Sequence, residues 1–253
     1  MTMLKFSEAN AKTKNLRELP ELQPYLANRR KVYSLDLLSG WSCPGACDCL
    51  ARVHELNGKR SLKDGPKTKF RCFSASQEVA YTNTYKARRF NFNLIKNCRG
   101  TGSVLKLLAK SMPKNLGVLR WHVAGDFFKR SYLEAAIELA RMNPDRLFYA
   151  YTKSLKFLAE FPMLDPSNGV LLPNFLITSS RGGKYDELID KIGVRTSTVV
   201  FDENTELPID HDDSHAATVG GDFALLLHGV QPAGSEASEA RKALNGKGSY
   251  RKG

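Results

Sequence analysis

Four of the chain's five cysteines lie between residues 43 and 72, and this clustering indicates a metal or redox site. Cys43, Cys47 and Cys49 stand in SGWSCPGACDC, and Cys72 follows in FRCFSASQEV. Three explanations are open: a disulfide, a zinc site or an iron–sulfur cluster. The odd total weakens the disulfide, and in a reducing cytosol clustered cysteines more often bind metal or do redox chemistry.

The spacing of the cysteines bears on which metal they would hold. A closed zinc site most often uses pairs separated by two to four residues. The gap from Cys43 to Cys47 suits such a site, the single residue between Cys47 and Cys49 suits it poorly, and Cys72 could complete a set. An iron–sulfur cluster needs thiolates alone and tolerates looser spacing on a loop. If only three cysteines are ligands, one iron is left open to bind another group.

The segment RWHVAGDFF supplies a histidine and a carboxylate. His122, Ala124 and Asp126 are two residues apart, so on a strand their side chains share one face. Asp126 could accept a hydrogen bond from a ligand, act as a base or bind metal. His122 and Asp126 are therefore the candidate catalytic residues, although a lone histidine in a strand is often a hydrogen-bonded core residue.

A second set of potential metal ligands occurs in DHDDSH, Asp210–His215. His211 and His215 are four residues apart and would share one face of a helix. A divalent-metal hydrolase using this loop competes with a solvated acidic loop. The loops SSRGGK and QPAGS could offer backbone N–H groups to an anion, or be ordinary turns.

The run YTNTYKARRFNFNLIKNCR interleaves aromatic and basic residues. Basic side chains can contact phosphates while aromatic rings stack on bases. Aromatic residues at helical spacing more often face the core. We therefore expect the rings to be core residues and the cations to be phosphate contacts: Lys86, Arg88, Arg89 and Lys96.

An alternation of strands and helices is predicted to position these groups. Predicted strands cover residues 31–40, 116–127, 146–154, 173–183, 197–203 and 222–229. Predicted helices cover residues 74–98, 103–110, 131–142, 155–161 and 184–192. Apolar strands that each precede a helix are typical of parallel α/β folds. We expect an N-terminal arm over 1–30 and one domain over 31–253, built as a partial (β/α)6-type barrel with outer helices; a doubly wound sheet is the alternative.

Polar residues follow every predicted strand. In parallel α/β folds the working face lies at the carboxyl ends of the strands. The cysteine segment follows the first strand, so its metal would occupy a catalytic position rather than a structural one. The sequence thus predicts one site at this rim.

The charge balance favours an anionic partner. The chain of 253 residues has 38 Lys and Arg against 26 Asp and Glu, a net charge of +12. Such a charge attracts nucleic acid or phosphorylated ligands, although it could simply keep a basic protein in solution. No apolar run approaches the roughly 20 residues that span a bilayer, and the first residues lack the apolar core of a signal peptide. We therefore expect no membrane association and a cytoplasmic protein.

The motifs SGWSCPGACDCL, FRCFSASQEV, RWHVAGDFF and FYAYTKS resemble those of the "gene product eighty-eight" family of bacteriophage and plasmid proteins. The resemblance runs from about Tyr33 to the end of the chain. It implies a phage or plasmid origin and action in the host cytosol. The family supplies no activity.

The order of polar residues also resembles that of the radical S-adenosylmethionine enzymes. In these enzymes three cysteines hold a [4Fe–4S] cluster whose open iron chelates the cofactor's amino and carboxylate groups. The resemblance implies Cys43 and Cys49 as ligands, together with Cys72 or Cys47. It also implies a set of cofactor-binding residues: Gly125, Asp126, Lys153, Ser179 and Ser180. The usual spacing is C-x3-C-x2-C, and here the last gap is one residue.

These observations give one leading prediction and two rivals. The leading prediction is a radical S-adenosylmethionine-like iron–sulfur enzyme that modifies a nucleic acid or nucleotide. The first rival is a metal-dependent hydrolase or base-modifying enzyme that uses His122, Asp126 and the Asp210–His215 loop. The second is a zinc-stabilised nucleic-acid-binding protein.

Overall fold

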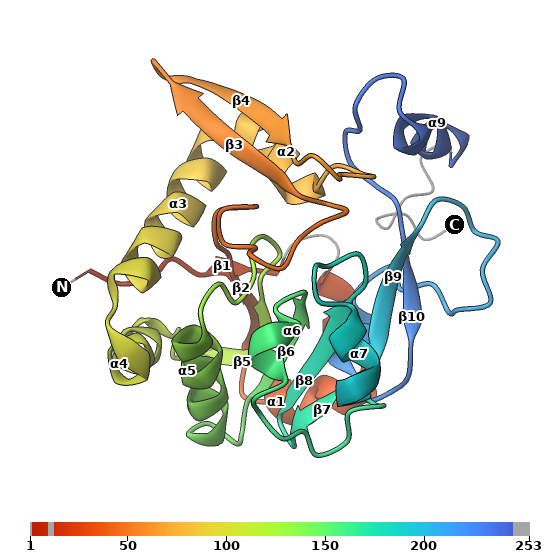
Figure 1. Ribbon diagram of the computed structural model, residues 1–253. Coiled ribbons are helices and arrows are strands. Elements are labelled where there is room, and N and C mark those ends of the chain that lie inside the picture. The colour runs from red at the N-terminus through yellow and green to blue at the C-terminus, as the bar shows by residue number, and fades with distance from the viewer. Residues whose placement is uncertain (1, 10–12, 245–253) are drawn as a thin grey trace.

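The parallel strands of the sheet follow the same order in space as along the chain (Figure 1). The computed structural model describes residues 2–9 and 13–244. In these residues six strands pair in parallel: β2 (Lys31–Leu35), β5 (Leu116–Trp121), β6 (Leu147–Thr152), β8 (Phe175–Ser180), β9 (Thr196–Val200) and β10 (Phe223–Leu226). Two antiparallel strands complete the sheet, β1 (Ser7–Glu8) beside β2 and β7 (Val170–Leu172) beside β8.

Helices connect the strands and cover both faces of the sheet (Figure 1). The α-helices are α1 (Gln23–Leu26), α2 (Phe73–Ala80), α3 (Thr82–Asn97), α4 (Gly100–Ser111), α5 (Arg130–Arg141), α6 (Leu155–Leu158), α7 (Glu187–Ile192), α8 (Ser214–Ala217) and α9 (Glu236–Ala243). Two 3-10 helices near the N-terminus are η1 (Lys14–Glu18) and η2 (Pro20–Leu22).

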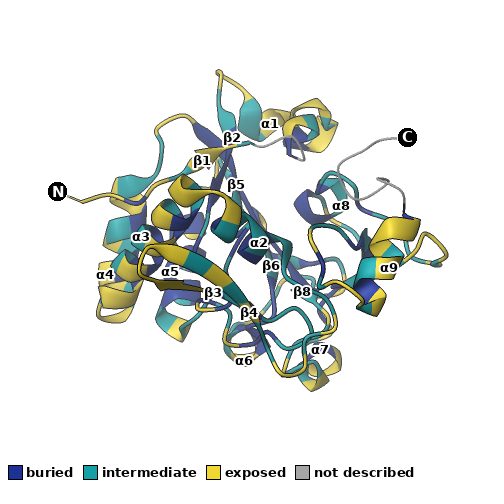
Figure 2. Ribbon diagram, turned by 90° about the horizontal axis from the view of Figure 1, so that it is seen from above, coloured by how far each residue is buried: buried dark blue, intermediate teal, exposed yellow. Residues whose placement is uncertain are grey.

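The two faces of the sheet pack against different layers because strand side chains alternate. Trp121 and Phe148 face a large apolar cluster that includes residues of α3, α4 and α5. Val118 and Tyr149 face the opposite side, where they meet Leu16 and residues of α8. In Figure 2 the central strands β2, β5, β6 and β8 are mostly dark blue, the colour of buried residues. The N-terminal residues described therefore pack on the sheet through η1 and η2.

The α/β prediction is confirmed in its coarser form, as a mostly parallel mixed sheet with helices. The strand order never reverses. Because crossovers between parallel strands are right-handed, we expect α5, α6 and α7 to lie on one face of the sheet. Among the described strands no pairing joins β10 to β1 or β2, so the sheet stays open. None of the described helices has the length and apolar character needed to cross a membrane.

The predicted helix over residues 74–98 is instead two helices. Tyr81 has an extended backbone (φ −115°, ψ 105°) that separates α2 from α3. Tyr85 and Phe92 are buried in the core, as expected for ring positions on a helix, whereas Tyr81 is 62% exposed. The break lets α2 and α3 pack against each other.

A β-hairpin was not predicted. Strands β3 (Ala51–Leu56) and β4 (Lys59–Asp64) pair antiparallel outside the main sheet. The turn residues Asn57 and Gly58 both have positive φ, 50° and 76°. Asn-Gly is the dipeptide that two-residue hairpin turns favour, so the signal was present in the sequence.

Candidate functional site

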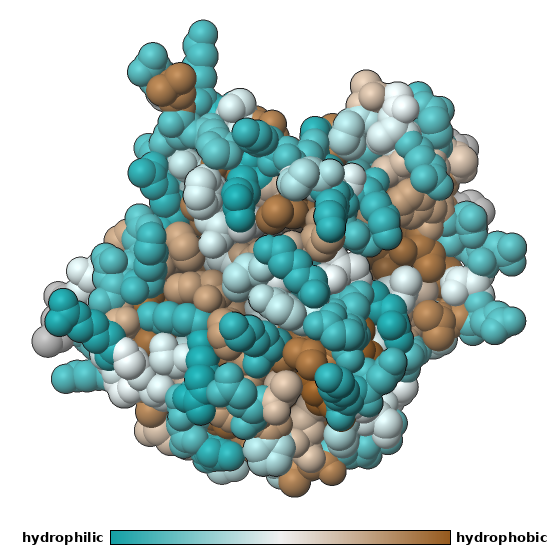
Figure 3. Space-filling model, in the orientation of Figure 1, coloured by the Kyte–Doolittle hydropathy of each residue, from teal (hydrophilic) through white to brown (hydrophobic). Residues whose placement is uncertain are grey.

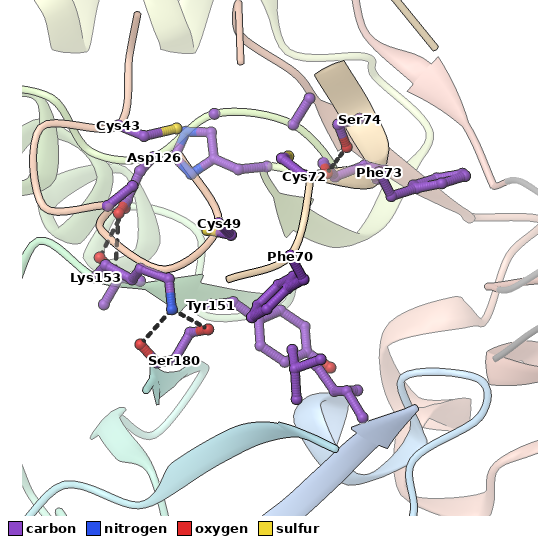
Figure 4. A pocket seen from close by; sticks show the side chains of 18 of the residues that line it. Cys43, Cys49, Phe70, Cys72, Phe73, Ser74, Asp126, Tyr151, Lys153 and Ser180 are labelled. Carbon is purple, nitrogen blue, oxygen red and sulfur yellow. Dashed lines mark hydrogen bonds between the residues drawn. The ribbon is translucent and has the colours of Figure 1, made fainter. Parts of the chain in front are cut away.

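A cavity of about 220 Å³ opens where the carboxyl ends of the parallel strands meet (Figure 4). Its walls come from the cysteine loop (residues 39–50), the start of α2 and the ends of the strands. The lining residues are Cys43, Ala46, Cys49, Phe70, Cys72, Phe73, Ser74, Arg120, His122, Val123, Ala124, Gly125, Asp126, Tyr151, Thr152, Lys153, Ser180, Val199, Leu225 and His228. The predicted rim therefore holds a concave site with sulfur, carboxylate and amine groups at one end and mostly apolar groups at the other.

Three of the cysteines line this cavity. Cys43 and Cys49 come from the cysteine loop, and Cys72 immediately precedes α2. Cys47 belongs to the same loop but is not part of the wall, and Cys98 lies at the end of α3. Of the two ligand sets left open by the sequence, only Cys43, Cys49 and Cys72 all line the cavity.

The three thiols share one electrostatic environment. Burial raises the pKa of Cys43 well above its usual range, and the charges of Asp126, Cys72 and Cys49 raise it further. Burial likewise raises the pKa of Cys49 to about 11, with Lys153 opposing the shift. Burial also raises the pKa of Cys72. These thiols are therefore protonated at neutral pH, because burial disfavours each thiolate and nearby negative charges add to that effect.

The cysteine loop is fastened to the strand ends by backbone contacts. The N–H of Asp48 donates to the carbonyl oxygen of Gly182 at 2.9 Å, and the N–H of Lys184 donates to that of Gly45 at 2.8 Å. Gly45 lies so close to β6 that a Cβ there would be 2.1 Å from the carbonyl oxygen of Lys153. A glycine at this position lets the loop approach the strand closely enough for Cys43 and Cys49 to reach the cavity.

Asp126 links the ends of β5 and β6. Its Oδ1 accepts hydrogen bonds from the N–H of Phe127 and the hydroxyl of Thr152, both at 2.7 Å, and its Oδ2 accepts one from the N–H of Lys153 at 2.9 Å. The residue is 4% exposed. Burial raises the pKa of Asp126, while these hydrogen bonds oppose the rise. Asp126 therefore holds the polar end of the cavity in shape as well as lining it.

Lys153 and Ser180 continue the polar wall beside Asp126 (Figure 4). The Nζ of Lys153 donates to the carbonyl oxygen of Ser180 at 2.8 Å and to its Oγ at 2.9 Å, and it also contacts the carbonyl oxygen of Arg181. Ser179 is fully buried and is not part of the wall. Of the two serines predicted to bind a cofactor, only Ser180 faces the cavity.

The family model described as gene product 88 matches residues 3–246 of the chain. The chain belongs to the gene product 88 family. Searches of curated proteins and of solved structures found no match. The expected family is therefore confirmed, whereas the expected likeness to radical S-adenosylmethionine enzymes has no counterpart in these comparisons.

In this family member the predicted strand alternation at His122 is wrong. Strand β5 ends at Trp121, and His122 has a left-handed backbone (φ 63°) that turns the chain into a loop. The Nε2 of His122 lies 2.9 Å from the hydroxyl oxygen of Tyr132. Burial, and secondarily the charge of Arg120, lowers the pKa of His122 to about 3. His122 still lines the cavity, but as a neutral ring at physiological pH.

The position of Gly125 requires a residue without a side chain. Its φ is 95°, and a Cβ would lie 2.6 Å from the Oγ of Ser42 and 2.7 Å from the Cβ of Leu37. Only glycine adopts this backbone without strain. The residue therefore allows the loop after β5 to pass close to the cysteine loop.

The Asp210–His215 loop does not reach the cavity wall. Its carboxylates are used within the fold: Asp213 pairs with Arg120 and accepts a hydrogen bond from the hydroxyl of Tyr149 at 3.0 Å, and Asp210 accepts one from that of Tyr151 at 3.3 Å. Across residues 2–9 and 13–244, no three His, Cys, Asp or Glu side chains are positioned to hold a single metal ion. The structure does not bring this loop together with His122 and Asp126.

The predicted anion loops bind groups of the chain itself. The carboxylate of Asp186 accepts hydrogen bonds from the N–H groups of Gly182 and Gly183 at 2.8 and 2.9 Å. In the second loop Ser235 caps α9 by accepting from the N–H of Ser238 at 3.1 Å. In both loops these polar groups therefore have hydrogen-bond partners within the chain and need no phosphate.

The four predicted phosphate contacts on α3 differ in accessibility. Lys86 and Lys96 are exposed, and Arg89 is exposed but pairs with a carboxylate of the β3–β4 hairpin at 2.9 Å. Arg88 is only 5% exposed and pairs with the buried Glu78 at 3.3 Å. The assignment of Arg88 to nucleic acid therefore needs correction, because its guanidinium serves the α2–α3 contact.

The lining residues that were not among the predicted site residues include Arg120, Tyr151 and His228. Arg120 is the one charged residue in the buried strand LGVLRW, which is a usable sequence signal. Tyr151 and His228 stand at or beyond the ends of β6 and β10. Nothing in their local sequence distinguishes them from ordinary core residues.

Proposed function

We propose that the protein is an iron–sulfur enzyme of the radical S-adenosylmethionine type, acting on a nucleic acid or nucleotide. The observation that carries the proposal is the convergence of Cys43, Cys49 and Cys72 on one cavity at the carboxyl ends of the strands. The one-way strand order suits the partial (β/α)6 barrel expected for such an enzyme.

The chemistry of the donor set fits a cluster. The three thiols have raised pKa values, so their thiolates need positive charge nearby. Cluster iron supplies that charge and takes thiolates as its usual ligands. Sulfurs around a single zinc lie about 3.8 Å apart, because each Zn–S bond is about 2.3 Å. Thiols that line a cavity rather than surround one point suit a larger cluster better.

A cluster held by three thiolates leaves one iron open, and when bound it would supply a coordination position for S-adenosylmethionine. The chain's own residues would then position that ligand. Ser180 offers its hydroxyl group next to the thiols. The ammonium of Lys153 uses its three N–H groups within the chain and adds positive charge there. Asp126 holds the backbone N–H of Lys153 in place. The apolar end, with Phe70, Tyr151 and further residues, offers a surface for an aromatic ring.

The net charge of +12 supports a phosphate-bearing substrate. A site enclosed by the cysteine loop, α2 and the strand ends suits a single nucleotide or extruded base rather than a folded polymer. We therefore assign the reaction to one nucleotide or one base at a time.

The test is an anaerobic purification followed by iron, sulfide and zinc analysis and an absorption spectrum with and without S-adenosylmethionine. The proposal predicts about four irons with matching sulfide and a spectrum that shifts when the cofactor is added. Stoichiometric zinc in a colourless protein would reject the proposal. Iron with a spectrum indifferent to the cofactor would keep the cluster and reject the cofactor.

A further inference from the structure

The β3–β4 hairpin joins two of the cavity's cysteines. It begins at Ala51, directly after the cysteine loop that carries Cys49, and the chain returns from Asp64 to Cys72. In Figure 1 the hairpin projects above the strand ends, at the upper left of the molecule. A ligand bound on it would therefore lie beside the site.

The outward face of the hairpin is basic. Alternation places Val53 and Leu62 on the inner face, against the apolar cluster. The outward face carries three facing pairs, Arg52 with Lys63, His54 with Ser61, and Leu56 with Lys59. Figure 2 colours much of this hairpin as exposed, and Figure 3 shows mainly hydrophilic side chains at the same corner.

One of these pairs places two basic residues opposite each other across the two strands. Arg52 and Lys63 are directly opposite, and like charges in that position destabilise a sheet. Neither Lys59 nor Lys63 has an ion-pair partner among the described residues, and both are exposed. Lysines on an exposed sheet edge can protect it from aggregation, which would explain isolated charges. It would not explain two basic residues placed opposite each other. An anion placed between them removes the repulsion.

An aromatic ring stands beside these charges. Trp41 is 43% exposed, its ring centroid lies 5.3 Å from that of His54, and the guanidinium of Arg52 lies 5.1 Å from it. The ring is two residues from Cys43. Exposed rings next to cations are the feature with which proteins stack unpaired bases while gripping the backbone.

We propose that the outward face of the β3–β4 hairpin, together with Trp41, binds single-stranded nucleic acid beside the cavity. Arg52, Lys59 and Lys63 contact backbone phosphates, and a base stacks on Trp41. A paired duplex keeps its bases stacked inside and offers none to the ring, so the ligand is a single strand or an unpaired loop. This inference rests on the proposed function, because the bound strand would be the substrate of the enzyme. The binding itself requires no iron–sulfur cluster.

The test is fluorescence anisotropy with a labelled 20-nucleotide single strand, DNA and RNA, and the matching duplex, on the full-length protein. Three phosphate contacts predict that the logarithm of affinity falls with that of salt with a slope of roughly −2. Lys59→Glu/Lys63→Glu should weaken binding about 25-fold at 0.1 M salt and reduce the slope by about 1.4. The matched control, Lys106→Glu/Lys110→Glu, makes the same charge change on exposed residues of α4 and should leave the slope unchanged.

Intrinsic fluorescence tests the stacking. The chain has two tryptophans, and Trp121 is fully buried, so quenching by added single strand should come from Trp41. Trp41→Ala should abolish the quenching and weaken binding.

Equal losses of affinity in the hairpin and α4 variants would overturn the proposal, as would preference for duplex. Binding only to phosphatidylserine vesicles would reject it in favour of a membrane surface. Iron content is measured separately, so loss of the enzyme proposal and loss of this one are distinguishable.

Discussion

The backbone N–H of Lys153 donates to the Oδ2 of Asp126 over 2.9 Å, while the side chain of the same lysine reaches the carbonyl oxygen of Ser180 at 2.8 Å. These contacts tie together the loop after β5, the end of β6 and the end of β8. Because a glycine of the cysteine loop packs on the carbonyl of Lys153, the polar end of the cavity depends on these contacts.

Asp126→Asn tests this role. The amide has one acceptor where the carboxylate has two, so the N–H of Lys153 or the hydroxyl of Thr152 loses its partner. We expect the free energy of unfolding to fall by about 1–3 kcal/mol, the cost of an unsatisfied buried group. Urea unfolding measures this. An unchanged unfolding midpoint would show that the linkage does not stabilise the loop.

His122 makes stability depend on pH. Its pKa is about 3 in the folded protein and near 6.5 when unfolded, so the unfolded chain binds the proton first as the pH falls. The stabilisation is therefore complete above about pH 6.5 and declines below it, by up to about 1.4 kcal/mol per pH unit, towards pH 3.

The corresponding variant is His122→Asn, since asparagine tolerates the left-handed backbone at this position. Unfolding measured across pH 4–7 should show a shallower slope for the variant than for the parent chain. Parallel slopes for the two proteins would contradict the buried neutral histidine.

Gly125→Ala should destabilise the protein by about 2 kcal/mol or more, because it adds strain at φ 95° and a clash with Ser42 and Leu37. Gly100→Ala is the control for strain alone. Gly100 has φ 72° and nothing within 4 Å of the added atom. We expect about 1 kcal/mol there. Equal losses in thermal or urea unfolding would mean that the close approach of the two loops is not tight.

The pair of Glu78 and Arg88 is buried, with side-chain exposures of 0% and 6%. Arg88→Gln leaves a buried carboxylate without its cation, which costs about 3–5 kcal/mol. Arg88 is not on the nucleic-acid surface proposed above, so the folded variant should bind the single strand with unchanged salt slope. A lower slope without loss of stability would return Arg88 to the set of phosphate contacts.

The sequence predicted the strands well where they are fully buried. Leu147–Thr152 and Phe175–Ser180 are short apolar runs, and their carboxyl ends carry the polar residues of the site. The hairpin at Asn57–Gly58 was missed although its turn signal was present. Which cysteines meet depends on the path of the chain between Cys49 and Cys72, and no spacing rule encodes that path.

Other errors came from tertiary context. The prediction that His122 and Asp126 share one face assumed that the strand continues through both residues. The left-handed backbone of His122 ends the strand before them. Arg88 is buried because it pairs with Glu78 on α2. The two side chains can meet because the chain breaks at Tyr81 and α2 packs against α3, which the prediction of a single helix did not include. Local pattern therefore predicted the buried strands, whereas the surroundings of His122 and Arg88 depend on contacts distant in sequence.

The most direct test of the central claim compares two cysteines of one loop. Cys49 lines the cavity and Cys47 does not. Anaerobically purified Cys49→Ser should lose most of its iron and sulfide and the associated absorption, while Cys47→Ser should retain the content of the parent chain. Equal iron in both variants, or loss of iron only in Cys47→Ser, would contradict the assignment of the cluster to Cys43, Cys49 and Cys72.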